Sequence, residues 1–160
     1  MKISIIVAVS QNGVIGDKKK LLWHISGDFK HFKEITTGHH ILMGQTTYES
    51  IGKLLPGRTS LILSFDKNFK VPGAFVFGSQ EEAIKFAEGS GEKELMIIGG
   101  GMIYKTFLPL AQKIYLTRIL KNYEGDVTFP EIKKSEWNEK IIEKHPKEDP
   151  PFEFVELTKK

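Results

Sequence analysis

Residues 95–101 read Leu-Met-Ile-Ile-Gly-Gly-Gly, and this stretch decides the fold class. Four consecutive apolar residues predict a strand covered on both faces, as in a parallel sheet with helices on each side. The glycines predict a tight turn into a helix that runs from about Gly101 to Leu108 and stops near Pro109. Glycines at such a turn let backbone N–H groups approach a phosphate. Tyr104 breaks the spacing of a dinucleotide fingerprint, however, so a simple strand-to-helix turn remains an alternative.

The same kinds of segment recur on both sides of this stretch. Further strands are predicted at 3–9, 41–43, 60–63, 74–77 and 113–117. Residues 152–157 alternate between apolar and polar side chains, which predicts an antiparallel edge strand. Because no linker or repeat interrupts the pattern, we expect one domain over residues 1–160.

Helices are predicted between the strands. Ser26 is the expected N-cap of a helix that ends near Thr36, and Thr46 or Thr47 opens a short helix through Ser50. Another helix starts after Ser79, whose spacing to Glu82 fits a capping box. Strands that alternate with helices predict an α/β fold with a largely parallel sheet. Ligands of such sheets bind at the carboxyl ends of the strands.

Composition excludes several classes of function. The chain has no cysteine, which rules out disulfides, thiolate metal sites and a cysteine nucleophile. A net charge of +3 is too small to indicate nucleic-acid binding, and the run Lys18 to Lys20 is interpreted as a solvated loop. The five histidines lack metal-like spacing, so no metal is expected. No apolar run is long enough to cross a membrane, and residues 3–9 fit a buried strand better than a signal peptide.

Asp28 is the first candidate for chemistry. A helix over 26–36 places Asp28, Phe32 and Ile35 on one face, four and three residues apart. A carboxylate on an apolar face is desolvated, which raises its pKa unless a cation lies near. Such a group is suited to bind a flat heterocycle with two adjacent N–H donors. The alternative is that Asp28 only stabilises the first turn of the helix through the helix dipole.

Two further loops carry candidate binding groups. Residues 44–47, Gly-Gln-Thr-Thr, follow a predicted strand and open a helix, so they offer hydroxyl and N–H groups to an anion. Residues 56–58, Pro-Gly-Arg, precede another strand. The Arg58 guanidinium is either a solvated charge or a fork that binds a carboxylate.

Taken together, these residues resemble dihydrofolate reductases of the bacterial single-chain type. The motifs that carry the resemblance are Val14-Ile15-Gly16, Trp23, Asp28, Phe32-Lys33, Met43-Gly44, Glu49-Ser50-Ile51-Gly52, Leu55-Pro56-Gly57-Arg58, Ile98-Gly99-Gly100-Gly101, Tyr104, Tyr115-Leu116-Thr117, Gly125-Asp126 and Phe129-Pro130. They cover nearly the whole chain in the family's order. The resemblance implies a mixed, mostly parallel sheet of about eight strands with an antiparallel C-terminal edge and about four helices. It also implies a cytoplasmic, monomeric enzyme that is a target of antifolates.

The implied reaction is the NADPH-dependent reduction of 7,8-dihydrofolate to tetrahydrofolate, with hydride transfer to C6 and protonation at N5. Asp28 would bind the 2-amino group and N3 side of the pterin, Thr117 would be hydrogen-bonded to Asp28, and Trp23 would order the water that delivers the proton. The expected substrate-binding residues are Ile6, Val7, Asp28, Phe29, Phe32, Ile51, Lys53, Leu55, Arg58, Ile98, Tyr104 and Thr117.

The resemblance further implies a cofactor site with a non-proline cis bond at Gly99-Gly100. The expected cofactor-binding residues are Ala8, Val14, Ile15, Gly16, Leu21, Gly44, Gln45, Thr46, Thr47, Leu63, Ser64, Phe65, Gly99, Gly100, Gly101, Met102, Ile103 and Tyr104. Residues 10–25 would form a lid over the nicotinamide, held by Asp126 against the backbone near Gly16.

Some positions depart from the family pattern. Leu22 stands where proline is frequent, Gln45 and Met102 replace basic residues that often meet the cofactor phosphates, and Phe65 replaces a polar residue. We therefore expect weaker NADPH binding than in relatives with both arginines. Two rival interpretations are a pyrimidine reductase on the same scaffold and a catalytically silent nucleotide-binding module.

Overall fold

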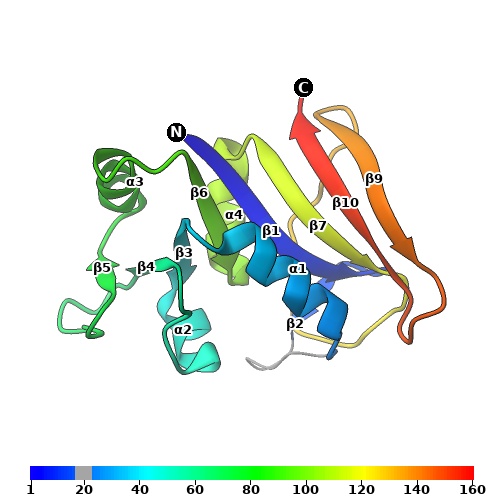
Figure 1. The fold of residues 1–160 in the computed structure, drawn as a ribbon, viewed down its shortest axis with the longest axis horizontal. Helices are drawn as coiled ribbons and strands as arrows, with labels where there is room; N and C mark the ends of the chain where they lie inside the picture. Colours follow the sequence, from blue (N-terminus) through cyan, green and yellow to red (C-terminus); the bar gives the residue numbers. More distant parts are fainter. Residues whose placement is uncertain (17–22) are drawn as a thin grey trace.

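The computed structural model describes residues 1–16 and 23–160. An eight-stranded sheet forms its centre, with the strand order β5-β4-β3-β6-β1-β7-β10-β9 (Figure 1). The bounds of these strands are β1 Lys2–Ser10, β3 His40–Gly44, β4 Thr59–Leu63, β5 Phe75–Phe77, β6 Glu94–Gly99, β7 Lys113–Ile119, β9 Trp137–His145 and β10 Phe152–Lys159. Neighbours from β5 to β7 are parallel, whereas β10 is antiparallel to β7 and β9. The expected fold class is thus confirmed.

The C-terminal edge of the sheet differs from the prediction. Residues 152–157 were expected at the edge, but β10 lies between β7 and β9, so that prediction is wrong. The true edge is β9, which the sequence did not indicate. Its side chains from Asn138 to Lys144 are exposed, so no buried alternation marks it as a strand.

Four helices connect the strands: α1 Ser26–Thr36, α2 Gln45–Ile51, α3 Gln80–Gly89 and α4 Gly101–Phe107. A 3-10 turn at Leu108–Leu110 follows α4, as the proline predicts. The predicted cap of α3 is confirmed, since the Ser79 hydroxyl accepts a hydrogen bond from the Glu82 backbone N–H at 3.2 Å.

Two predicted helix starts are wrong. Ser26 is the first residue of α1 rather than its N-cap, because the backbone N–H groups of Asp28 and Phe29 donate to the carbonyl of Ile25. Helix α2 begins at Gln45 with Gly44 as its N-cap, one residue before Thr46. In neither helix does a side chain cap the first turn.

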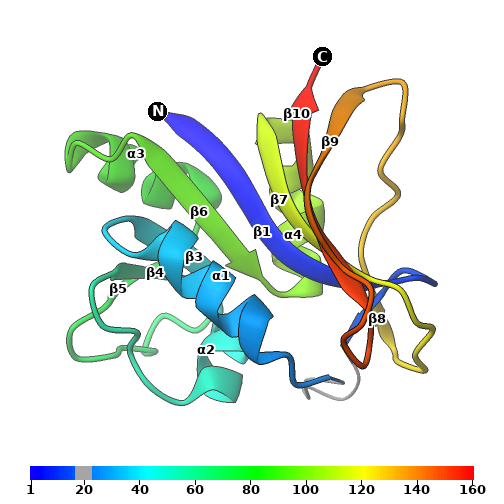
Figure 2. The ribbon, with the colours of Figure 1, turned by 45° about the vertical axis from the view of Figure 1, so that its right-hand side comes forward.

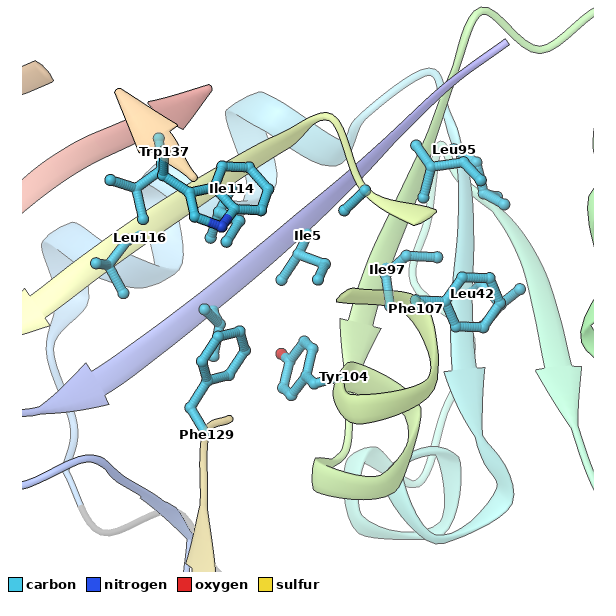
Figure 3. Packing of buried hydrophobic residues seen from close by; sticks show 14 of the residues in the cluster. Ile5, Leu42, Leu95, Ile97, Tyr104, Phe107, Ile114, Leu116, Phe129 and Trp137 are labelled. Carbon is cyan, nitrogen blue, oxygen red and sulfur yellow. The ribbon is translucent and has the colours of Figure 1, made fainter. Parts of the chain in front are cut away.

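The core consists of two layers, one on each face of the sheet. Strand β1 shows the division: Ile5 packs in the layer under α3 and α4, whereas Ile6 packs in the layer under α1 and α2. Figures 1 and 2 show α1 on the near face of the sheet and α4 behind it. In the α4 layer, Tyr104 and Phe107 of α4 meet Ile5, Ile97 and Phe129 (Figure 3).

The order of the strands brings several loops together at their carboxyl ends. Strand β6 lies between β1 and β3, and the chain then continues on the far side of β1 as β7. The loops after β1, β3, β6 and β7 therefore meet at one edge, which is where parallel sheets bind ligands. A small ribbon of β2 (Val14–Gly16) and β8 (Val127–Thr128) is the second sheet. None of the described helices is long and apolar enough to cross a membrane.

Candidate active site

Asp28 of α1 lies over the sheet and is held by Thr117 of β7. The Thr117 hydroxyl donates a hydrogen bond of 2.6 Å to Asp28 Oδ1, and Thr117 itself is buried. Burial raises the pKa of Asp28, while the bond from Thr117 and the nearby His31 lower it. Desolvation is the largest of these effects, so the pKa is raised, as expected from an acid on the apolar face of α1. Phe32 and Ile35 pack into the core on that face.

Trp23 is buried immediately before α1 and packs beside this carboxyl-bearing turn. Its ring meets Tyr123 edge-on at 5.1 Å between centroids, and it shares a cluster with Ile25 and Phe152. Phe29 is 42% exposed and packs against His24 at 5.0 Å. The predictions for Leu21, for Leu22 and for the run Lys18 to Lys20 lie outside the described residues.

Tyr104 of α4 bridges the adjacent strands β1 and β6 at this edge of the sheet. Tyr104 Oη lies 2.8 Å from the carbonyl oxygens of both Ile6 and Ile98, so its single proton can be donated to either of them. Tyr104 is buried, and desolvation raises its pKa, which keeps the hydroxyl protonated. The sequence indicated Tyr104 only as a contact; this bridge depends on α4 crossing beneath both strands.

Glycines let three loops approach one another closely. Gly99 has φ of +125°, and the predicted cis bond between Gly99 and Gly100 is confirmed. A Cβ on Gly100 would lie 3.1 Å from Thr47 Oγ1, and one on Gly101 would lie 2.6 Å from Val127 Cγ1. The first turn of α2, the loop before α4 and the strand β8 therefore lie so close together that a side chain at Gly100 or Gly101 would force its neighbour to shift.

The glycine cradle, formed by Gly99 to Gly101 and the first turns of α2 and α4, presents backbone N–H groups suited to an anion. The first turns of α2 and α4 lie side by side, and backbone N–H groups at the start of a helix have no partner within the helix. Ser64 borders the cradle, donating a hydrogen bond of 2.5 Å to Gln45 Oε1 and accepting one from Asp66 N at 3.1 Å. Phe65 and Met102 are 92% and 70% exposed. Because both side chains are uncharged, the edge lacks charge at these two positions, which depart from the family pattern.

Arg58 lies at the other end of α1. Its Nε donates to the carbonyl of Pro56 at 2.9 Å, and its Nη1 donates to the hydroxyl of Thr36 at 3.2 Å. Thr36 was not singled out in the sequence, because a buried threonine at a helix end carries no distinct signal. The two bonds orient the guanidinium, whereas Lys53 nearby in sequence is exposed.

The structure divides the remaining predicted residues between two places. Phe32, Ile51 and Leu55 pack in the same layer as Ile6 and Ile98, between α1 and α2. The side chains of Val7 and Leu63 point into the opposite core layer, so only their backbone is available to a ligand. Among residues 1–16 and 23–160, no group of three or more histidine, cysteine, aspartate or glutamate side chains could hold a metal ion.

A half-buried carboxyl beside a glycine-lined cradle is typical of a nucleotide-dependent oxidoreductase. The comparisons with known proteins define the particular family. The chain belongs to the dihydrofolate reductase family, whose family model, described as dihydrofolate reductase, matches residues 2–159. It is 39% identical to the dihydrofolate reductase of Staphylococcus haemolyticus over 96% of this chain and 92% of the relative. The dihydrofolate reductase type 3 of Salmonella typhimurium is 37% identical, over 99% of both chains.

A solved structure shows the same fold. Dihydrofolate reductase from Enterococcus faecalis, complexed with NADP(H) and RAB-propyl, superposes with a TM-score of 0.88 at 30% identity, over 99% of this chain and 96% of that chain. The chain is an oxidoreductase that reduces 7,8-dihydrofolate to 5,6,7,8-tetrahydrofolate with NADPH, and its product carries one-carbon units for thymidylate and purine synthesis. This assignment excludes the two rival interpretations.

Proposed function

We propose that Asp28, Thr117 and Trp23 carry the chemistry of this reduction. The observation that supports the proposal is the 2.6 Å bond between Thr117 and Asp28, which aims a desolvated carboxyl across the sheet beside the glycine cradle. Two carboxyl oxygens can accept from the 2-amino group and the N3 side of a pterin. The Thr117 hydroxyl donates to one of them, which fixes the orientation of the carboxyl.

Asp28 also controls the proton. Its raised pKa means that a larger share of the carboxyl holds a proton near neutral pH than an ordinary aspartate would. In our proposal the proton reaches N5 through a water molecule that Trp23 orders, since Asp28 itself faces the opposite edge of the pterin. When bound, NADPH supplies the hydride for C6. The protein contributes position and one proton, and no covalent intermediate is required.

The rest of the substrate extends along α1. Phe32, Ile51 and Leu55 would enclose the aminobenzoyl ring, with Phe29 closing the outer side. Arg58, oriented by Pro56 and Thr36, would bind the glutamate carboxylate through its remaining N–H groups. The carbonyls of Ile6 and Ile98 would face the amino group of an antifolate at position 4.

The cofactor would lie across the carboxyl ends of β1, β3, β4 and β6. Ala8 and Ile15 would contact the nicotinamide. The phosphates would meet the backbone of the two glycine loops, and the hydroxyl groups around them would supply further contacts. The residues proposed to hold the cofactor in these ways are Val14, Gly16, Gly44, Gln45, Thr46, Thr47, Ser64, Phe65, Gly99, Gly100, Gly101, Met102 and Ile103.

The test is loss of NADPH absorbance when dihydrofolate is added to the purified protein, for the parent and for Asp28→Asn. The variant keeps the shape of the side chain and its contact with Thr117 but cannot carry the proton. We expect at least a 100-fold loss of activity at neutral pH, in line with the contribution of a general acid. Asp149→Asn is the matched control, because Asp149 is exposed in the loop before β10. Full activity of Asp28→Asn would refute the role of the carboxyl.

We also propose that the enzyme acts as a cytoplasmic monomer and that residues 1–160 form one domain. In support, one sheet extends from Lys2 to Lys159, and a single chain supplies every residue proposed for the site. Light scattering coupled to gel filtration would show the mass of one chain, 18.1 kDa, if the proposal of a monomer is right. A mass of twice that value would overturn it.

A further inference from the structure

His31 lies one helical turn beyond Asp28 and is stacked on the sheet. Its ring is nearly parallel to that of Phe154 on β10, with 3.9 Å between centroids and 12° between planes. His31 is half-buried, and it is not among the residues assigned to substrate or cofactor above. A stacked pair of this kind fixes the rotation of a helix against a strand.

The stacking partner is a direct neighbour of the residue that holds Asp28. Phe154 lies opposite Thr117 in the antiparallel pairing of β10 with β7. On the helix, Asp28 and His31 are three residues apart and therefore share a face. Two adjacent residues of the sheet thus hold two neighbouring residues of α1. Thr117 holds Asp28, and Phe154 holds His31.

We propose that His31 is a positioning residue for the reductase reaction. Stacked on Phe154, it fixes the helical turn that carries Asp28, and its positive charge interacts with the Asp28 carboxylate across that turn. The inference rests on the role proposed for Asp28. It adds that the pH dependence of the enzyme belongs to the pair of groups rather than to one carboxyl.

The surroundings of His31 make Asp28 its main electrostatic partner. Burial lowers the pKa of His31, and Asp28 is the strongest of the groups that raise it. The other acidic groups that act on it are Glu34 on α1, Glu143 on β9 and Glu156 on β10.

Two of these three acids also have basic partners. Glu156 pairs with Lys113 at 2.9 Å, and Glu143 pairs with His145 at 2.7 Å. His145 in turn lies edge-on to Phe154 at 5.5 Å, so it belongs to the same surroundings. The Lys113 ammonium reduces the effect of Glu156 on His31.

The coupling has a definite sign. A protonated His31 favours the Asp28 carboxylate and so lowers the pKa of Asp28, against the effect of burial. When His31 loses its proton, its contribution ends and only the hydrogen bond from Thr117 still opposes the effect of desolvation on the pKa of Asp28. Removing the imidazole should therefore raise the pKa of Asp28, and removing the carboxylate should lower the pKa of His31.

The test is an NMR titration of the free protein, with the Asp28 carboxyl carbon and the His31 ring followed in the parent, in His31→Phe and in Asp28→Asn. Phenylalanine keeps a ring to stack on Phe154 but has no charge. Two charges about 6 Å apart interact enough, even in water, to move a titration by about half a pH unit. We expect the midpoint of Asp28 to rise by at least that amount in His31→Phe, and the midpoint of His31 to fall by a similar amount in Asp28→Asn.

Lys30→Gln is the matched control, because Lys30 is exposed on the same turn of α1 and its loss also removes one positive charge. This variant should leave both midpoints within about 0.2 pH units of the parent, as expected for a solvated charge. A midpoint of Asp28 that is unchanged in His31→Phe would refute the coupling. The coupling would also be refuted if the midpoint of Asp28 rose in His31→Phe while the midpoint of His31 stayed unchanged in Asp28→Asn. Altered packing in His31→Phe would then explain the rise.

Activity provides a second, separate readout. The pH profile of kcat/KM in His31→Phe should move to higher pH together with the midpoint of Asp28, whereas His31→Ala should in addition raise the KM for dihydrofolate because the stacking is lost. A profile that stays in place while the midpoint moves would refute the catalytic part of the proposal. Failure of the proposed function is distinguishable, because it would leave Asp28→Asn fully active whatever the titrations show.

Discussion

Replacing Thr117 with valine isolates the hydrogen bond that orients the proposed catalytic carboxyl. Valine matches threonine in shape, and Thr117 is only 3% exposed, so the change removes the donor and leaves little cavity. A hydrogen bond to a charged acceptor is worth about 1.5–3 kcal/mol. The bond to Asp28 is 2.6 Å long, which places it among the short, charge-assisted ones.

The sign of the effect follows from the two states of Asp28. The bond from Thr117 lowers the pKa of this carboxyl, so its loss raises the pKa beyond the increase that burial already causes. Less carboxylate is then present at neutral pH. A ligand that binds the ionised form, such as a 2,4-diaminopyrimidine antifolate, should therefore bind about 10- to 100-fold more weakly in Thr117→Val.

Titration of the ligand against tryptophan fluorescence between pH 5 and 9 measures this loss. In an Asp28→Asn background the same valine substitution should change affinity less than about threefold, because no charged acceptor remains. Thr158→Val, at an exposed position of β10, serves as the control for the exchange itself. If Thr117→Val binds like the parent over the whole range of pH, the bond does not support the carboxyl and the reasoning fails.

Three further predictions concern other parts of the structure. Tyr104→Phe removes the hydroxyl that donates to the buried carbonyls of Ile6 and Ile98. The free energy of unfolding, measured by urea denaturation, should fall by about 1–3 kcal/mol. Equal stability would show that these carbonyls find other hydrogen-bond donors. Gln45→Arg gives up the hydrogen bond from Ser64 but adds a cation at the edge of the cradle. NADPH should therefore bind about tenfold more tightly, and NADH about as before. An unchanged affinity for NADPH in a cofactor titration would contradict this prediction. Burial of Glu92 opposes its ionisation, but hydrogen bonds from the imidazoles of His39 at 2.8 Å and His40 at 2.7 Å and from the backbone N–H groups of His40 and Glu94 lower its pKa from 4.5 to about 2. The stabilisation from ionised Glu92 is therefore complete above pH 4.5 and is lost as the pH falls toward 2. Glu92→Gln should lower the free energy of unfolding by about 2 kcal/mol at pH 7. The difference in this free energy between parent and variant should narrow steadily in denaturation curves below pH 4.5.

Local patterns in the sequence were enough to predict most of the central strands, the helices and the groups available for chemistry. Continuous apolar runs such as residues 95–98 predict strands covered on both faces, and the glycines after them predict a close turn; the structure confirmed both. Asp28 was identified because helical periodicity places it on an apolar face, which is a local property of the chain. The predicted cap at Ser79 is local in the same way, and it was confirmed.

Which of these groups meet depends on how the chain folds as a whole. The edge strand β9 escaped prediction because most of its side chains are exposed, so its place depends on its pairing with β10, on buried Trp137 and on the ion pair between Glu139 and Arg118. Asp28 and Thr117, 89 positions apart in the sequence, come together through the order of strands in the sheet, as do the two strands that Tyr104 bridges. Periodicity reports which face of an element is buried, but not which distant element covers it. That choice depends on the packing of the whole sheet. The hydrogen bond of Asp28 with Thr117 and the stacking of His31 on Phe154 could therefore be found only in the folded protein.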